Sequence, residues 1–315
     1  MIRRALAAVT AAALLVITSP SLQANGLAHT PAAHAASAAV DAAATGVQAS
    51  VLTTYAGGST VLDHPQFAST RSLSTSYSIF LPPRYAVCSQ RYPVLYLLQG
   101  VAGDSTEWQS IGLLEAADRL IQDGVIEPML IVLPNGGANY WVNHADGARW
   151  GDYLVADVVA SVDREYRSIP DRDDRAVGGL SMGGEGALRM AMLNPDVFGI
   201  AAAHSPSLRT AYDQLAPELQ NLYGTEANWR AVSGLWLATE SDAAYRLNIS
   251  IDVGQDDPWR PNVELLHARL LERGINHQFS VLPGEHAAEY WIENVDRYVG
   301  FYANAFSMAS QARSL

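Results

Sequence analysis

The hydrophobic pattern changes near residue 50, from an Ala-rich stretch to short segments typical of strands and helices. Three segments rich in Val, Thr, Tyr and Ile and bounded by Gly or Pro predict antiparallel strands at 48–55, 59–63 and 75–81. Continuous apolar runs further along the chain predict strands buried on both faces of a parallel sheet, at 94–98, 129–133, 175–180, 198–204, 248–253 and 277–282.

Amphipathic segments alternate with these strands. They predict helices at 107–123, 153–166, 182–193, 263–272 and 287–306. Residues 207–246 contain helical fragments without a strand, which predicts an insertion over the sheet. The alternation predicts the α/β class, with a mostly parallel, doubly wound sheet, helices on both faces and an antiparallel N-terminal edge. We expect one domain over 50–308, followed by a tail at 309–315.

The amino terminus has the pattern of an export signal. A short cationic start precedes an apolar run that ends near Ile17, followed by small residues. The run is shorter than the roughly 20 apolar residues that a spanning helix needs, so an uncleaved anchor is the weaker alternative. We predict a signal peptide over 1–35, with cleavage after Ala24 or Ala35, and a disordered leader over 36–49. The mature protein is expected to be secreted, extracellular or in the cell envelope, without stable membrane insertion.

Composition excludes several kinds of chemistry. The sequence has no Lys, so its 20 basic residues are all Arg, and Walker-loop, pyridoxal and Ser-Lys mechanisms are excluded. The net charge of −12 and the scattered Arg residues argue against nucleic-acid binding. Cys88 is the only cysteine, so the chain forms no internal disulfide. No His pair has a zinc-binding spacing, and we predict neither a metal nor a cofactor.

The segment Gly179-Leu180-Ser181-Met182-Gly183 matches the G-x-S-x-G nucleophile elbow. A predicted strand enters it and a predicted helix leaves it, which is the setting that the elbow requires. The two glycines remove the Cβ atoms that would clash in so sharp a turn. The backbone N–H of Met182 would face a developing oxyanion at the start of the helix.

A serine nucleophile needs a base and an orienting carboxylate, and the chain supplies candidates for both downstream. Asp256 and Asp257 follow the strand predicted at 248–253, and His286 follows the strand at 277–282. The order Ser, Asp, His is that of α/β hydrolases. His204 and His144 are rival bases, but both precede the acid and would break this order.

A second oxyanion donor is expected in the loop that follows the strand at 94–98. Small residues over 99–103 would let the backbone approach an acyl oxygen, and the N–H of Val101 is the candidate. The alternative is an ordinary glycine turn. The aromatic residues of 140–150 and the 207–246 insertion would frame the acyl or alcohol group, or else simply pack under a long loop.

These residues resemble the putative-esterase branch of the α/β hydrolases, which includes feruloyl and acetylxylan esterases, mycolyltransferases, S-formylglutathione hydrolase and enterochelin esterases. The resemblance spans about 75–302 and rests on 92–100 with Trp108, on 179–188, and on 283–286 with Trp291. It implies the α/β-hydrolase fold and the following roles: nucleophile Ser181, base His286, acid Asp257 with Asp256 as runner-up, and oxyanion donors Val101 and Met182.

The resemblance also has departures, which concern substrate choice. Gln99 stands where many members have His or Asp, and His204-Ser205-Pro206 replaces a common Ser-Gly. Residues predicted to contact substrate are Gln99, Gly100, Tyr140, Trp141, Trp150, His204 and Trp291. We expect a secreted serine esterase acting on small-molecule or polysaccharide esters. The alternatives are an acyltransferase of mycolyltransferase type and a non-catalytic binding protein with the same fold.

Overall fold

The computed structural model describes residues 49–68 and 73–313. The predicted signal peptide and all but the last residue of the predicted leader lie outside the described residues, so both stay predictions.

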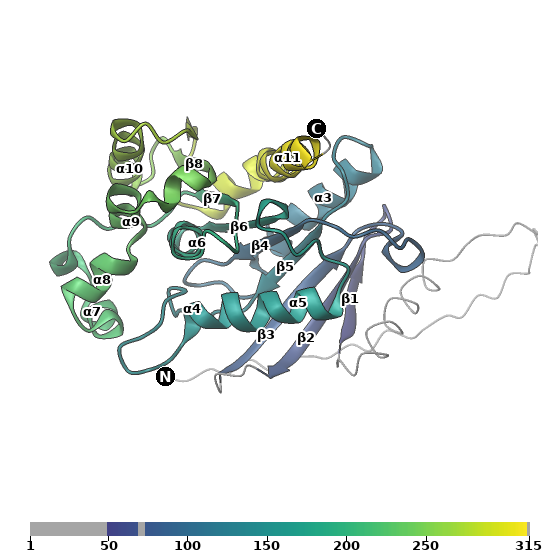
Figure 1. Cartoon of the computed structure of the whole chain (residues 1–315), viewed down its shortest axis with the longest axis horizontal. Coiled ribbons are helices and arrows are strands. Elements are labelled where there is room, and N and C mark those ends of the chain that lie inside the picture. The colour runs from purple at the N-terminus through teal and green to yellow at the C-terminus, as the bar shows by residue number, and fades with distance from the viewer. Residues whose placement is uncertain (1–48, 69–72, 314–315) are drawn as a thin grey trace, which may run out of the picture. The chain divides into compact units, whose positions relative to one another are not determined.

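A nine-stranded sheet forms the centre of the described chain, with the strand order β1-β2-β3-β5-β4-β6-β7-β8-β9 (Figure 1). Its strands are β1 (Ser50–Thr54), β2 (Thr60–Ala68), β3 (Ser74–Leu81), β4 (Val94–Leu98), β5 (Leu130–Pro134), β6 (Arg175–Leu180), β7 (Ile200–His204), β8 (Asn248–Gly254) and β9 (His277–Leu282). The strands from β5 to β9 in this order are parallel. The pairs β1–β2, β2–β3 and β3–β5 are antiparallel. This confirms the predicted α/β class with an antiparallel N-terminal edge.

Helices cover both faces of this sheet. They are α2 (Glu107–Ser110), α3 (Leu113–Gln122), α4 (Trp150–Asp152), α5 (Val159–Glu165), α6 (Met182–Leu193), α7 (Pro217–Tyr223), α8 (Glu226–Val232), α9 (Gly234–Glu240), α10 (Arg260–Glu272) and α11 (Ala288–Arg313). Helices α3 and α11 pack together on one face, and α4 and α5 lie on the other (Figure 1). Successive side chains of β4 enter the two cores alternately, which explains its uninterrupted apolar run.

Four predicted helices have different bounds in the structure. The helix predicted at 263–272 begins three residues earlier, at Arg260. The helix predicted at 107–123 is divided into α2 and α3, because Gly112 has a φ of 85°. The helix predicted from 153 begins at Trp150 and contains a π-helical stretch, Tyr153–Val158, between α4 and α5. Helix α11 continues to Arg313, whose guanidinium pairs with Asp174 at 2.5 Å. The predicted tail is therefore helical as far as Arg313.

The 207–246 insertion contains helices and no strand in the structure, as predicted. Helices α7, α8 and α9 follow one another there and gather at the end of the sheet away from β1 (Figure 1). Trp229 on α8 is buried with Leu215, Leu219 and Tyr223 in a small separate core.

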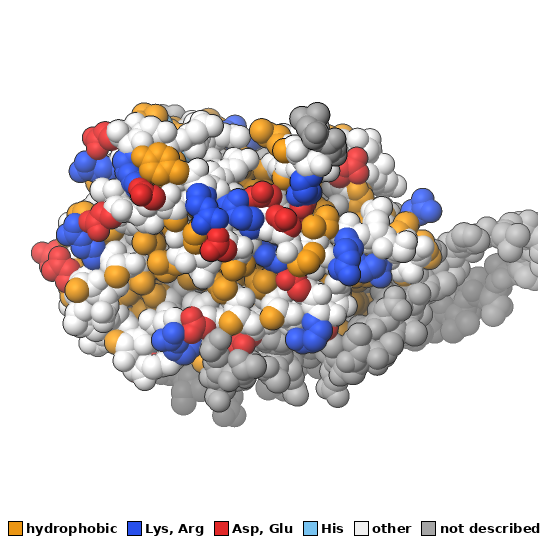
Figure 2. All heavy atoms as spheres, viewed as in Figure 1, with side chains coloured by type: hydrophobic (Ala, Val, Ile, Leu, Met, Phe, Trp, Pro, Cys, Tyr) orange, Lys and Arg blue, Asp and Glu red, His pale blue; other side chains and the backbone are white. Residues whose placement is uncertain are grey.

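Acidic and basic side chains are intermixed over the face drawn in Figure 2. Among residues 49–68 and 73–313, no helix is long and apolar enough to cross a membrane.

His64 on β2 is a buried histidine that predicts a pH dependence of stability. Its Nε2 lies 2.5 Å from the Tyr166 hydroxyl, and its ring stacks on Tyr77 at 4.2 Å. Burial lowers the pKa of His64 from 6.5 to about 4, and nearby carboxylates offset this only in part.

Below pH 6.5 the unfolded chain therefore binds a proton at this residue that the folded protein does not bind. The free energy of unfolding is expected to fall by about 3 kcal/mol from this group alone as the pH drops from about 7 to 4. Urea unfolding across that range should show a correspondingly smaller change in a His64→Gln variant. An equal pH dependence in the variant and the wild type would contradict the assignment.

Candidate active site

Parallel pairing brings the loops that carry the candidate residues to one edge of the sheet. Leu98 pairs with Gly179, so the loops after β4 and β6 leave the sheet side by side. Leu180 pairs in turn with His204 on β7. Gly254 pairs with Leu282, so the loops after β8 and β9 also leave together. This carboxyl edge is where ligands bind in open α/β sheets.

Ser181 stands on a strained turn between β6 and α6. Its φ of 53° lies in the left-handed region, which a non-glycine residue rarely adopts. A Cβ on Gly179 would lie 2.2 Å from the carbonyl of Gly183, and a Cβ on Gly183 would lie 2.2 Å from the Leu98 carbonyl oxygen. Both glycines are therefore required by close backbone approach. The serine side chain is left half-buried at the start of α6.

A chain of hydrogen bonds joins Ser181, His286 and Asp257. His286 Nε2 lies 2.9 Å from Ser181 Oγ, and His286 Nδ1 lies 2.7 Å from Asp257 Oδ2. A carboxylate can only accept, so Nδ1 carries the proton and Nε2 is free to accept from the serine hydroxyl. The imidazole also packs edge-on against Trp291 at 5.1 Å.

Asp257 is held as an ionised carboxylate. Burial by itself raises the pKa of Asp257, but hydrogen bonds from His286, from the Ser205 hydroxyl and from the Trp259 backbone N–H outweigh it, and the pKa is lowered. The Trp259 N–H donates to Oδ1 at 2.7 Å, and the Ser205 hydroxyl donates to Oδ2. Asp256, the runner-up acid, is exposed, and its backbone N–H donates to Gly284.

The loop expected to supply an oxyanion donor is a tight turn after β4. Gly103 N–H donates to the Gly100 carbonyl at 3.2 Å, and Val101 between them is 47% exposed. Gly100 N–H donates to the Glu107 carboxylate at 2.7 Å, so Glu107 on α2 holds the turn in place. Burial raises the pKa of Glu107. Sequence reasoning missed this residue, and the only signal was an acid at the start of the following helix.

Three of the residues predicted to contact substrate are almost completely buried and bond to other parts of the protein. The Gln99 amide lies within hydrogen-bonding distance of backbone groups of Gly136 and Gly137. Trp141 has a φ of 53° and its indole N–H donates to the Gln99 carbonyl at 3.4 Å. His204 bonds Asp252 through Nδ1 at 2.6 Å. Each of the three predicted contacts is only 1% exposed, so these side chains support the walls of the site instead of facing a substrate.

The other predicted contacts lie in different settings. Gly100 contributes its N–H to the Glu107 carboxylate, and Trp291 is 8% exposed and packs against His286. Trp150 is half-buried and packs edge-on against Tyr153 at 5.8 Å. Tyr140 is half-buried with a φ of 53°, and its ring lies beside the guanidinium of Arg209.

A buried polar network lies behind the serine. The His204 carbonyl accepts from the backbone N–H of Ser181 at 3.1 Å and from the Trp291 indole at 3.4 Å. Asp252 accepts from the His204 ring and from the hydroxyls of Tyr290 and Tyr298. These hydrogen bonds link β7 to β8 and α11. They hold β7 in place, and β7 carries the His204 carbonyl that accepts from the Ser181 N–H.

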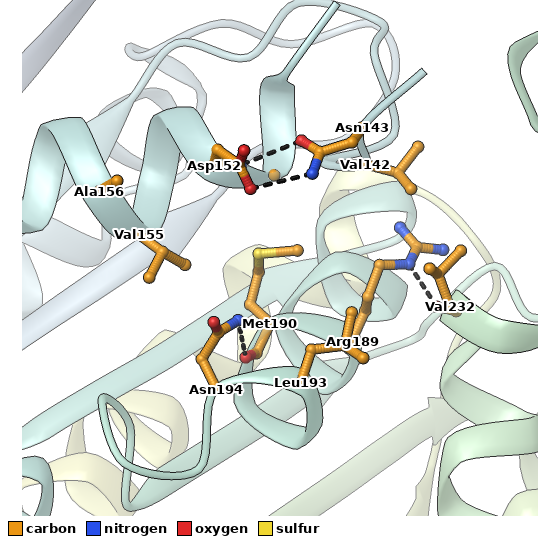
Figure 3. A pocket seen from close by; sticks show the side chains of 11 residues that line it. Val142, Asn143, Asp152, Val155, Ala156, Arg189, Met190, Leu193, Asn194 and Val232 are labelled. Atoms are coloured by element: carbon orange, nitrogen blue, oxygen red, sulfur yellow. Dashed lines mark hydrogen bonds between the residues drawn. The ribbon is translucent and has the colours of Figure 1, made fainter. Parts of the chain in front are cut away.

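A cavity of about 410 Å³ lies elsewhere, along the C-terminal half of α6 (Figure 3). Asn143 and Asp152 face each other across two hydrogen bonds on one wall. The buried Arg189 guanidinium donates to the Val232 carbonyl on another. None of the residues of the Ser181 hydrogen-bond chain lines this cavity. Within the described ranges, no group of three or more His, Cys, Asp or Glu side chains is arranged to hold a metal ion.

The sheet order and the serine on a strand-to-helix turn define an α/β-hydrolase fold. A family model described as putative esterase matches residues 72–302. The chain therefore belongs to the putative esterase family, as its motifs indicated.

Curated relatives match over part of their length. An esterase of Mycobacterium tuberculosis is 33% identical over 133 residues, which cover 41% of this chain and 28% of the relative. An endo-1,4-beta-xylanase/feruloyl esterase of Xylanibacter ruminicola is 30% identical over 142 residues, which cover 42% of this chain and 19% of the relative. The matched segments thus span less than a third of either relative.

Solved structures match more completely. A ferulic acid esterase superposes with a TM-score of 0.70 at 26% identity, covering 79% of this chain and 98% of its own. An S-formylglutathione hydrolase from Agrobacterium tumefaciens superposes with a TM-score of 0.66 at 19% identity, covering 82% and 98%. At the second identity the likeness concerns the fold alone.

Proposed function

We propose that the protein is a secreted serine esterase in which Ser181 is the nucleophile, His286 the base and Asp257 the orienting acid. The observation that carries the proposal is the hydrogen-bond chain through the three side chains, at 2.9 Å and 2.7 Å. Membership of the putative esterase family supports ester hydrolysis. The amino-terminal signal pattern supports secretion.

The proposed reaction has two halves. Ser181 Oγ attacks the ester carbonyl carbon while His286 Nε2 takes the hydroxyl proton, and the backbone N–H groups of Val101 and Met182 bind the oxyanion. The tetrahedral intermediate collapses, and His286 gives the proton to the departing alcohol. Water then attacks the acyl-serine while His286 Nε2 takes its proton. The second tetrahedral intermediate collapses, the bond from Ser181 Oγ to the acyl carbon breaks, His286 returns the proton to Oγ, and the free acid leaves.

We propose small-molecule or polysaccharide esters as substrates. The similarity to an endo-1,4-beta-xylanase/feruloyl esterase and to a ferulic acid esterase of solved structure supports an aromatic acyl group. The alternative acyl acceptor is a sugar or lipid hydroxyl. The identity of the products distinguishes this acceptor from water.

The test combines turnover with covalent labelling. The mature protein is expected to hydrolyse p-nitrophenyl esters, with rates that depend on acyl chain length, and a fluorophosphonate should label Ser181 stoichiometrically and abolish turnover in proportion. Peptide mass spectrometry locates the label, and chromatography with and without a sugar acceptor identifies the product. Absence of both labelling and turnover would favour the binding-protein alternative. An acyl sugar as the main product would replace hydrolysis with acyl transfer.

A further inference from the structure

Arg209 is a cation among the loops of the candidate site that the proposed reaction does not use. It lies in the segment that follows β7, and its Nη1 donates to the Ser207 carbonyl at 2.6 Å. Ser207 in turn donates its backbone N–H to the Ser181 carbonyl at 3.1 Å. The guanidinium is thus linked to the nucleophile through one intervening residue.

Two aromatic rings flank this guanidinium. Its Cζ lies 4.5 Å from the ring centroid of Trp259 and 5.9 Å from that of Tyr140. Trp259 follows β8, and its backbone N–H bonds Asp257, whereas Tyr140 belongs to the segment after β5. Arg209 therefore lies between two of the loops that meet at the candidate active site, and its half-buried side chain remains accessible to a ligand.

The positive charge of Arg209 has no anionic partner in the described part of the chain. The groups that contact it are neutral: the Ser207 carbonyl, the indole of Trp259, and the phenol of Tyr140, whose pKa is raised by burial. The Glu185 carboxylate, which also acts on Tyr140, is paired with Arg189 at 3.0 Å. Two other arginines that pack on aromatic rings in the described residues are paired with carboxylates, and a third, Arg167 over Tyr85, is not. Arg273 over Tyr245 forms an ion pair with Asp242 at 2.7 Å. Arg230 over Trp236 forms an ion pair with Glu240 at 2.5 Å.

We propose that Arg209 is a specificity-determining residue that binds a carboxylate carried by the substrate ester, a proposal that rests on the proposed esterase function. Guanidinium donors match a carboxylate in a planar, two-bond arrangement. Partial burial between two rings strengthens such a pair relative to one in open water. The net charge of the chain is −12, so its surface as a whole does not attract anions. The unpaired Arg209 guanidinium would therefore favour a substrate with a carboxylate over a neutral one at this site.

Two matched pairs of esters test this proposal and locate the carboxylate. The alcohol pair is 4-acetoxybenzoate and 4-acetoxybenzamide, and the acyl pair is mono-p-nitrophenyl adipate and its methyl ester. The measured quantity is the ratio of kcat/KM for the anionic member to that for the neutral member. In at least one pair, Arg209→Gln is expected to lower this ratio by about tenfold or more, and Arg209→Lys by less.

Arg230→Gln is the matched control, because it also removes an arginine from an aromatic ring but one whose charge is already paired. Its ratios should equal those of the wild type. If Arg209→Gln lowers kcat/KM by the same factor for the anionic and the neutral ester of both pairs, Arg209 only packs the loop and the proposal is overturned.

A binding measurement separates this proposal from the esterase function. Calorimetry measures the affinities of 4-hydroxybenzoate, adipate and 4-hydroxybenzamide for two proteins. One is the Ser181→Ala variant, and the other carries both Ser181→Ala and Arg209→Gln. Tighter carboxylate binding that is lost with Arg209→Gln supports the subsite even if the wild type hydrolyses none of the esters, in which case the esterase proposal alone fails. The opposite result would be turnover of the neutral esters with no preference for carboxylates in binding and no change in the kcat/KM ratio on Arg209→Gln. This result would overturn the Arg209 proposal and leave the esterase proposal standing.

Discussion

Replacing Ser181 by alanine is expected to lower kcat/KM for ester hydrolysis by about a millionfold. The variant removes the atom that would form the acyl-enzyme, so the covalent route is lost. The residual rate should reflect only binding and the oxyanion donors, which together leave about 10³- to 10⁴-fold over water in other serine hydrolases. Initial rates on p-nitrophenyl acetate, corrected for spontaneous hydrolysis, measure the loss.

The same substitution should leave the fold intact. The backbone bonds of Ser181 to His204 and Ser207 do not involve its hydroxyl, and alanine tolerates a φ of 53° no worse than serine does. Circular dichroism and thermal unfolding check this. Ser233→Ala is a matched control, because its hydroxyl is buried and makes no hydrogen bond. A folded Ser181→Ala protein that keeps more than about 1% of wild-type activity would contradict the proposed nucleophile.

Most of the fold follows from periodicity in the sequence. The strands at β6 and β9 and the helix at α6 have the bounds that the pattern predicted. A strand such as β4 reads as an unbroken apolar run because both of its faces are buried. The division between α2 and α3 could not be predicted, because Gly112 inside an amphipathic segment is compatible either with a continuous helix or with a left-handed break.

In the candidate site, some residues can be identified from the sequence, but the orientation of the side chains cannot. Gly179 and Gly183 are recognisable because the elbow requires glycine at both positions, and the order Ser, Asp, His points to His286. The sequence also predicts that Trp141 and His204 lie at the same edge of the sheet. It does not say which way a side chain turns, and both of these turn into the core.

Residues that act through single long-range contacts leave almost no local signal. Glu107 reaches back to the Gly100 N–H, and Ser205 adopts a φ of 51° and donates to Asp257. Arg209 matters because of what the structure places beside it, and its neighbours in sequence are unremarkable. Such residues are found only when the loops after different strands are seen together.

The choice between Asp256 and Asp257 has the same origin. Adjacent residues on a loop point in different directions, and backbone contacts between the β8 and β9 loops decide which one faces His286. A Cβ on Gly254 would lie 2.6 Å from the Gly284 carbonyl oxygen, and Asp256 N–H donates to that carbonyl at 2.9 Å. This contact turns the Asp257 carboxylate inward.

Asp257→Asn is therefore expected to lower kcat by about 10⁴-fold, whereas the matched Asp256→Asn should change it by less than about twofold. The Trp259 N–H donates to Oδ1, so the amide oxygen of the new asparagine would stay there and its NH₂ would replace Oδ2. That NH₂ donates to His286 Nδ1 and leaves the proton on Nε2. An imidazole in this tautomer cannot accept the proton of Ser181.

Steady-state kinetics of both variants on p-nitrophenyl acetate measure the difference, and fluorophosphonate labelling rates report on the nucleophile separately. Because asparagine has nearly the volume of aspartate, Asp257→Asn should fold, and its labelling should slow together with turnover. A large loss in Asp256→Asn with wild-type rates in Asp257→Asn would reverse the assignment. Equal small losses in both would mean that His286 needs no carboxylate to hold its tautomer, which contradicts the proposed role of the hydrogen bond at 2.7 Å.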